Sequence, residues 1–192
     1  MLYSDMRTFY TIALAAVLLT MFGNTASAQR WSISTNMLDY ADFLTLNVEG
    51  GVSVHRHWSV SVKGRYNPFY FRTDSGGQLQ NKTLTVAAGV RYWPFFVYSG
   101  FYYGTRLQWS RYNSGGIFSP VTEEGDAMGL GLMFGYSLIV TKHINIEFGL
   151  GLWGGAAVYR KYSSPVCGKR TGSGVKAFIA PNDIHINLMF NF

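Results

Sequence analysis

The sequence predicts an all-β fold, an eight-stranded antiparallel up-and-down β-barrel of the small outer-membrane type, formed as one domain by residues 29–192. Three observations predict it. Apolar and polar residues alternate along eight segments, so each segment has one apolar and one mostly polar face. The segments run to about 9–11 residues, the length that a tilted strand needs to cross a bilayer. The connections alternate between short and long, as periplasmic turns and outer loops do.

The composition fits this class. Of 192 residues, 48% are hydrophobic, 17% are aromatic, 14% are charged and 22 are glycine. Abundant aromatic residues and glycine with few charges are typical of many strands and turns. The net charge of +6 is moderate and does not indicate a nucleic-acid partner. Cys167 is the one cysteine, which excludes an internal disulfide and a thiolate zinc cluster. A free thiol, an intermolecular link and a metal ligand stay open for it.

Residues 1–28 have the features of a secretory signal peptide. Arg7 precedes an apolar stretch over 9–22, and Ala26-Ser27-Ala28 supplies the small residues of a cleavage site. A membrane-anchor helix is the competing interpretation, but the apolar stretch is about 14 residues long, short of the ~20 that spanning requires. We therefore expect Sec-type export, cleavage after Ala28 and a location in the bacterial outer membrane.

The first three expected strands follow one another closely. Residues 31–37 alternate, and 39–43 form a short connection. Residues 46–54 alternate next, before a tight turn at 55–57. Residues 58–66 give the clearest strand, because their apolar and polar faces barely mix.

The next two strands lie between long connections. Residues 67–82 contain Pro, Asp and Gly, which are turn formers. Residues 84–92 then alternate, 94–100 turn the chain, and 101–109 alternate again. Residues 110–126 form a second long connection.

The last three strands repeat the rhythm. Residues 128–138 and 144–153 alternate on either side of a turn at 140–143. The connection 160–183 leads to the closing strand, 184–192. No segment requires a helix.

The closing strand carries the strongest membrane signature. One face is apolar throughout, and the other is polar apart from Met189. The strand ends on the aromatic Phe192, as the last strand of an outer-membrane barrel often does when it closes against the first. We expect the barrel-assembly machinery to recognise this strand. The apolar residues are Ile184, Ile186, Leu188, Phe190 and Phe192.

A soluble eight-stranded barrel of the lipocalin type is the alternative fold. Its apolar faces would point inward around a ligand, and its polar faces would meet water and be rich in Lys and Glu. Here the polar faces carry Ser, Asn, Gly and few charges, which favours a narrow lumen. Aromatic residues also lie where the girdles of a membrane barrel are expected. They are Trp58, Tyr92, Phe101, Phe190 and Phe192 at one end and Tyr66, Trp109 and Tyr159 at the other.

Six charged residues fall on the inward faces. An eight-stranded barrel has an interior just wide enough for side chains, and opposite charges in so narrow a space must pair. We therefore predict a lumen plugged by an internal ion-pair network and no stable conductance. Its members are Glu49, Lys63, Arg65, Arg91, Arg106 and Glu147.

No catalytic residues are assigned. The alternative function is a lipid A-modifying enzyme with a His/Ser/Asp site at the outer rim. Its candidates are His185 and Asp183, with Ser163, Ser164 and Ser173 in the preceding connection. The other interpretation of His185 is a lumen-facing residue at the barrel mouth.

The last long connection is basic and has no acidic residue before Asp183. It suits contact with lipopolysaccharide phosphates or an acidic surface polymer, or it is a solvated loop. His55 and His57 share a strand face but have no third metal ligand nearby, so no metal site and no cofactor are expected. The basic residues are Arg160, Lys161, Lys169, Arg170 and Lys176.

Short motifs carry a family resemblance over roughly residues 31–192. They are Ser34-Thr35-Asn36, Asn67-Pro68-Phe69, Arg91-Tyr92-Trp93, Tyr112-Asn113 with Gly115-Gly116, Gly135-Tyr136, and Cys167-Gly168-Lys169. Together they resemble an uncharacterised family of Bacteroidota proteins, the domain of unknown function 3575. The resemblance implies a small outer-membrane barrel, with some members encoded near fimbrial genes and no established activity. Members often have a second cysteine in the last loop, whereas here Cys167 is the one cysteine of the chain.

The expected function is a structural or surface-interaction role in the cell envelope. The expected partners are outer-membrane lipid and lipopolysaccharide, and a surface protein or glycan that meets the outer loops. A fimbrial association is implied by the resemblance alone.

Overall fold

The structure, a computed structural model, describes residues 30–72, 78–115, 121–163, 168–181 and 183–192. The predicted signal peptide and Cys167 lie outside these ranges. None of the helical structure within them has both the length and the apolar content that crossing a bilayer would take. The elements are β1 (Trp31–Asn36), α2 (Met37–Ala41), β2 (Leu46–His55), β3 (Trp58–Asn67), β4 (Tyr70–Arg72), β5 (Gln78–Tyr92), β6 (Gly100–Gly115), β7 (Thr122–Ile139), β8 (Ile144–Tyr162), β9 (Arg170–Pro181) and β10 (His185–Asn191).

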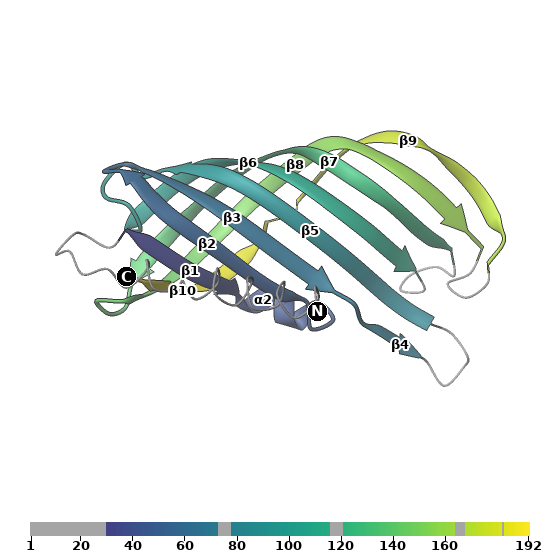
Figure 1. Cartoon of the computed structure of the whole chain (residues 1–192), viewed down its shortest axis with the longest axis horizontal. Coiled ribbons are helices and arrows are strands. Elements are labelled where there is room, and N and C mark those ends of the chain that lie inside the picture. Colours follow the sequence, from purple (N-terminus) through teal and green to yellow (C-terminus); the bar gives the residue numbers. More distant parts are fainter. Residues whose placement is uncertain (1–29, 73–77, 116–120, 164–167, 182) are drawn as a thin grey trace, which may run out of the picture.

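Eight of the described strands close into a ring (Figure 1). Their order is β10, β1, β2, β3, β5, β6, β7 and β8, and β8 pairs back to β10. The ring therefore has the predicted number of strands, and every pairing in it is antiparallel, as predicted. β4 pairs with β5 outside the ring, and β9 pairs with the second half of β8.

The ring is strongly staggered. The residues paired in sequence from Ile33 through β2, β3, β5, β6 and β7 lead to Gly154 on β8, whereas those through β10 lead to Ile144, ten residues away. With ~3.3 Å per residue and ~4.7 Å between strands, this offset corresponds to a strand tilt of roughly 40°. A ring of eight strands at this tilt has an interior that side chains can fill.

The apolar face of each ring strand lies outside, and the polar face lies inside. Exposed exterior residues include Ile33, Val48, Val62, Val86, Leu107, Leu130, Leu150 and Leu188. Buried interior residues include Ser32, Ser34, Ser59, Ser61, Thr85, Gln108, Asn145 and Asn187. Because strand side chains alternate, a shift of the register by one residue would exchange the exterior and interior sets. The burial pattern therefore also fixes the register.

The two ends of the ring differ. The turn end carries the short turns 56–57, 93–99 and 140–143. The extended end lies opposite, where the far halves of β5 to β8 continue past the shorter β1, β2 and β3 (Figure 1).

The strands at the extended end are longer than predicted. Residues 110–115 and 122–126, expected in a connection, belong to β6 and β7. The predicted connection 160–183 is largely a hairpin, since β8 continues to Tyr162 and β9 occupies Arg170–Pro181. The expectation failed because the exterior face turns polar there, which removes the apolar alternation that marks a strand.

A short helix also departs from the expectation that no segment requires one. Asn36 caps α2 by accepting a hydrogen bond from the Leu38 amide at 3.1 Å. Phe43 and Leu44 then have positive φ angles of 52° and 57°, which return the chain into β2. A five-residue helix is too short to produce a readable 3.6-residue period.

Candidate functional site

The candidate site is a buried ionic cluster inside the ring. Six charged side chains form it, three cations and three anions, each from a different part of the wall. Strand alternation turns five of them inward, and the segment before β10 supplies the sixth, Asp183. All are buried. The ionic cluster is Glu49 of β2, Lys63 of β3, Arg91 of β5, Arg106 of β6, Glu147 of β8 and Asp183.

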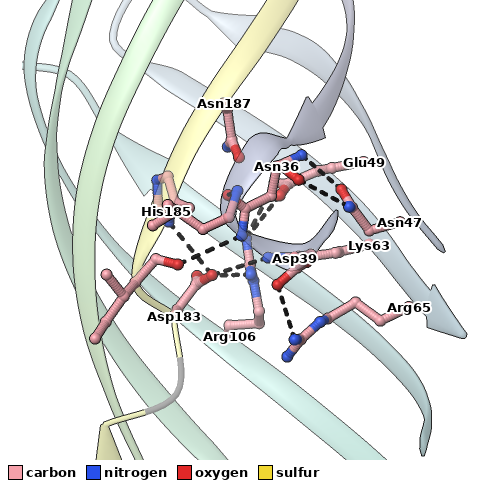
Figure 2. A network of polar contacts seen from close by, with 12 residues as sticks. Asn36, Asp39, Asn47, Glu49, Lys63, Arg65, Arg106, Asp183, His185 and Asn187 are labelled. Carbon is pink, nitrogen blue, oxygen red and sulfur yellow. Dashed lines mark hydrogen bonds and ion pairs between the residues drawn. The ribbon is translucent and has the colours of Figure 1, made fainter. Parts of the chain in front are cut away.

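The cluster is a continuous chain of contacts, and Figure 2 shows the part of it formed by Glu49, Lys63, Arg106 and Asp183. Glu49 Oε1 lies 2.5 Å from Arg91 Nη2 and 3.0 Å from Arg106 Nη2. Arg91 Nη1 lies 3.3 Å from Glu147 Oε2. Asp183 Oδ2 lies 2.7 Å from Arg106 Nη1, and Asp183 Oδ1 lies 2.9 Å from Lys63 Nζ. Equal numbers of charges of each sign leave the cluster formally neutral, which is what burial demands of ionised groups.

His185 and Asp183, the candidates for a catalytic pair, belong to this interior. His185 Nδ1 lies 3.3 Å from Asp183 Oδ1, and its Nε2 lies 2.6 Å from the Tyr102 hydroxyl. His185 pairs with Gly149 on β8, whereas Ser173 pairs with Arg160, eleven residues further along. At ~3.3 Å per residue the serine is roughly 36 Å away along the strand. Ser163 accepts a hydrogen bond from the Lys169 amide in the distant hairpin, and Ser164 lies outside the described residues.

Arg65, the remaining predicted member, forms a separate ion pair nearer the extended end. Its Nη2 lies 2.8 Å from Oδ1 of Asp39 in α2. The amide side chain of Asn47 donates to the Asn36 carbonyl at 3.0 Å, and its oxygen accepts from the Asn36 amide at 2.6 Å (Figure 2). These contacts tie α2 to the wall formed by β2 and β3.

Aromatic side chains fill the turn end. Trp93 lies 4.8 Å from the Tyr102 ring and 5.8 Å from the Tyr98 ring, measured between centroids. Trp93 Nε1 donates to Ser59 Oγ at 2.9 Å, and Asn145 Nδ2 donates to the Tyr98 carbonyl at 2.6 Å. Tyr98 has a φ of 65°, unusual for a side chain of this size, so the turn is shaped to direct the ring inward.

Glycines make room for the largest interior side chains. A Cβ at Gly135 would stand 2.5 Å from Cζ of Tyr102, and one at Gly149 would collide with the His185 ring. A Cβ at Gly104 would meet Met133 Cγ at 2.9 Å. Large side chains therefore fill the interior only because the residues facing them are glycines, which have no side chain of their own. The cavity between Arg106 and Trp153 has a volume of about 10 Å³, at most the size of one water molecule.

The predicted basic loop becomes the basic hairpin, formed by the ends of β8 and β9 and defined by Arg160, Lys161, Lys169, Arg170 and Lys176. Lys176 forms an ion pair with Glu123 of β7, and Lys161 lies 3.8 Å from the same carboxylate. Burial alone would raise the pKa of Glu123, but hydrogen bonds from Lys176 and Tyr112 and the charge of both lysines hold it below its usual range. Glu123 is thus a local tie between β7 and the hairpin.

The other histidines lie at the turn end. His57 Nδ1 lies 2.9 Å from the Trp93 carbonyl oxygen, and His143 Nδ1 lies 3.0 Å from that of Asn191. The rings of His55 and His57 are 6.5 Å apart. Among the described residues, no group of three or more His, Cys, Asp or Glu side chains could hold a metal ion.

Sequence reasoning missed two contributors to the interior. It considers Asp183 only with His185, and it assigns Asp39 to a connection. Asp183 and Asp39 lie outside the alternating strand segments, so no periodic pattern marks them as inward. Their acidic character among the inward lysines and arginines is the one signal that could have indicated them.

Fold and site together define a closed eight-stranded antiparallel ring with an apolar exterior and an ionic interior. A family model described as "Protein of unknown function (DUF3575)" matches residues 13–192. The chain therefore belongs to this family, as the resemblance predicted. A search of the curated proteins found no match, and neither did a search of the solved structures.

Proposed function

We propose that the chain is a small outer-membrane β-barrel with a filled lumen, which serves as a structural or surface-interaction protein of the cell envelope. The observation that carries the proposal is the inverted distribution of side chains, with apolar residues outside and paired charges inside. An exterior of this kind forms a large apolar surface, which water disfavours and lipid tails solvate.

The height of the apolar exterior supports this environment. On β7 the exposed apolar residues run from Met128 to Leu138, and at a tilt of roughly 40° ten residues rise about 25 Å. This matches the ~25 Å band of outer-membrane barrels. Beyond Met128 the same face carries Asp126 and Glu124, where a headgroup region would begin.

Aromatic contacts at the turn end fit the lower boundary of such a band. The ring centroids of Trp58 and Tyr92 lie 5.0 Å apart, and those of Phe101 and Tyr136 lie 4.9 Å apart. Each pair joins neighbouring strands on the exterior. Tyr159, expected in the opposite girdle, instead lies under the ammonium groups of Lys161 and Lys176 at the extended end. With the short turns in the periplasm, the extended end and its basic hairpin would stand outside the cell, facing lipopolysaccharide phosphates or a surface partner.

The test is expression of the full chain with its leader in a Gram-negative host, followed by fractionation. We expect the mature chain in the outer membrane, extractable only with detergent, and with a gel mobility that changes on boiling. In planar bilayers it should give no steady conductance, because the ionic cluster and the aromatic side chains at the turn end fill the lumen.

Two outcomes would overturn the proposal. A mature chain that is folded and monodisperse in water without detergent would remove the membrane location. A steady open channel would leave the location standing but remove the filled lumen.

A further inference from the structure

The edge of β9 is open. β9 pairs with β8 from Leu152 to Tyr162, and no described strand pairs with its other side. Toward the turn end, β10 takes the place of β9 beside β8 and pairs with β1 to close the ring. Toward the extended end no such closure follows, because β1 ends at Asn36 and is followed by α2. β9 therefore borders the molecule, as Figure 1 shows along the far upper margin.

The part of the open edge around Val175 stands clear of the proposed membrane band. Each step from β7 to β8 to β9 climbs roughly 3 Å toward the extended end at a tilt of about 40°. Val175 pairs with Val158, which pairs with Asp126, so Val175 lies beyond the charged boundary of the exterior. Val175 is nonetheless 71% exposed, among the most exposed apolar side chains described. An apolar side chain left uncovered in water beside an unpaired strand edge marks an interaction surface.

The usual protection of an edge strand is weak along β9. Lysine and proline commonly block such edges. Here the Lys176 ammonium is turned to Glu123 and to the Tyr159 ring, 5.0 Å away, and Pro181 stands only at the end of the strand.

We propose that the open edge of β9 binds an extended, acidic segment of a partner polypeptide, which adds to the sheet as one further strand. The charge of the basic hairpin selects the occupant. Arg160, Lys161 and Lys176 pair with Glu123 or Glu124 of β7, whereas Lys169 and Arg170 form no ion pair among the described residues and leave the hairpin with surplus positive charge. A second copy of the chain would place one basic hairpin against another, which like charges disfavour. This inference rests on the proposed function, because it takes the extended end to face water outside the membrane.

The probe is a fluorescent ten-residue peptide that alternates Glu and Val, added to the mature chain in detergent at neutral pH. Its controls are a peptide that alternates Lys and Val, and a Glu/Val peptide interrupted by proline. We expect fluorescence anisotropy to report binding of the acidic peptide at least tenfold tighter than either control.

Two neighbouring substitutions, Gly174→Pro and Val175→Pro, locate the binding edge. Adjacent strand residues direct their N–H groups to opposite neighbours, so one proline removes a donor facing β8 and the other removes a donor facing the open edge. Whichever of the two variants loses the donor at the open edge should keep the heat-modifiable ring and bind the acidic peptide at least tenfold more weakly. Arg170→Glu should also weaken binding, while Arg56→Glu at the turn end should not.

Several results would refute strand addition. Equal binding of the proline-interrupted peptide, or full binding by both proline variants, would indicate general charge attraction instead. A dimer of the chain that a proline variant dissociates would identify a second copy as the occupant. No binding by an intact, membrane-inserted ring would refute this inference and leave the proposed function standing, whereas a chain soluble without detergent would refute the proposed function itself.

Discussion

Glu49 is the central residue of the ionic cluster, because it contacts both of the cluster's arginines. Glu49→Gln would keep the shape of the side chain and remove its charge, leaving two buried cations with one carboxylate fewer. We expect a loss of about 3–5 kcal/mol in the free energy of unfolding, the usual effect of removing one partner from a buried pair. Urea unfolding of the detergent-solubilised chain, followed by gel mobility, measures it.

The matched control is Glu124→Gln, which breaks an ion pair at the extended end. Arg160 lies 3.8 Å from Glu124 there, with its side chain largely exposed. Exposed pairs contribute about 0–1 kcal/mol, so this variant should unfold close to the wild type. Equal effects of the two substitutions would mean that the interior is hydrated and the cluster is not a buried unit.

Gly149 tests whether the interior is filled. An added Cβ would overlap the His185 ring and stand 2.7 Å from the Tyr102 hydroxyl. Gly149→Ala should therefore destabilise the ring by about 1–3 kcal/mol, the typical cost of overpacking. Gly50→Ala is the control, because a Cβ there meets nothing within 4 Å. The midpoint temperature of the gel-mobility change compares them, and two equal midpoints would contradict a tightly filled interior.

At this scale the sequence indicates where a side chain points but not what it meets. Glu49, Arg91 and Arg106 were assigned inward because strand side chains alternate strictly. Which carboxylate each arginine meets depends on the stagger of the ring, and a single sequence carries no direct record of stagger. Asp183 was missed as a partner of Lys63 because it lies in an irregular segment between two strands.

The elements at the extended end are tied together by side chains that titrate. Because the folded-state pKa of Glu123 is lowered, its ion pairs stabilise the basic hairpin fully above the ordinary pKa of 4.5 and are lost as the pH falls from there through the folded-state pKa. We expect amide exchange in β9, corrected for the intrinsic pH dependence, to rise about two- to fivefold below that pH, in keeping with an exposed pair of about 0.4–1 kcal/mol. Glu123→Gln should show the faster exchange at every pH, and a wild-type profile independent of pH would argue against the tie.

Prediction of elements succeeded where one face was apolar and failed where neither was. The strand over 58–66 was expected from its clean alternation and is present as β3. In β9, Gly172 and Gly174 alternate with Thr and Ser, which resembles a loop even though β8 pairs with it throughout. The short helix α2 is specified by the Asn36 cap and by tertiary contacts, and neither produces a periodic pattern.

For the molecule as a whole, the decisive question is which solvent surrounds the ring. Leu132 and Val175 are both 71% exposed on the exterior, but only Leu132 lies within the proposed membrane band. Leu132→Arg should cost about 2–4 kcal/mol in a bilayer, whereas Val175→Arg should cost about 0–1 kcal/mol. Reversible unfolding from lipid vesicles measures both, and a Leu132→Arg variant as stable as the wild type would place that exterior in water.

The global order of the strands could be predicted because consecutive hairpins leave few alternatives. Short and long connections alternate, antiparallel neighbours follow one another in sequence, and the apolar closing strand requires a partner. The break between β9 and β10 could not be foreseen. Pro181 ends one strand and β10 begins at His185, so β8 has two successive partners along the same edge.

That break bears on how the molecule assembles. Lys63 and Arg106 belong to β3 and β6, yet the carboxylate they share arrives only with Asp183, on the segment that leads into β10. Until β10 pairs with β1 and closes the ring, the incomplete wall carries surplus positive charge, which the low dielectric of the proposed membrane would disfavour. The pairing of β10 with β1 and the compensation of the charge by Asp183 then occur as a single event. A partly open ring should therefore be scarce at equilibrium, and the ring should assemble in an all-or-none transition.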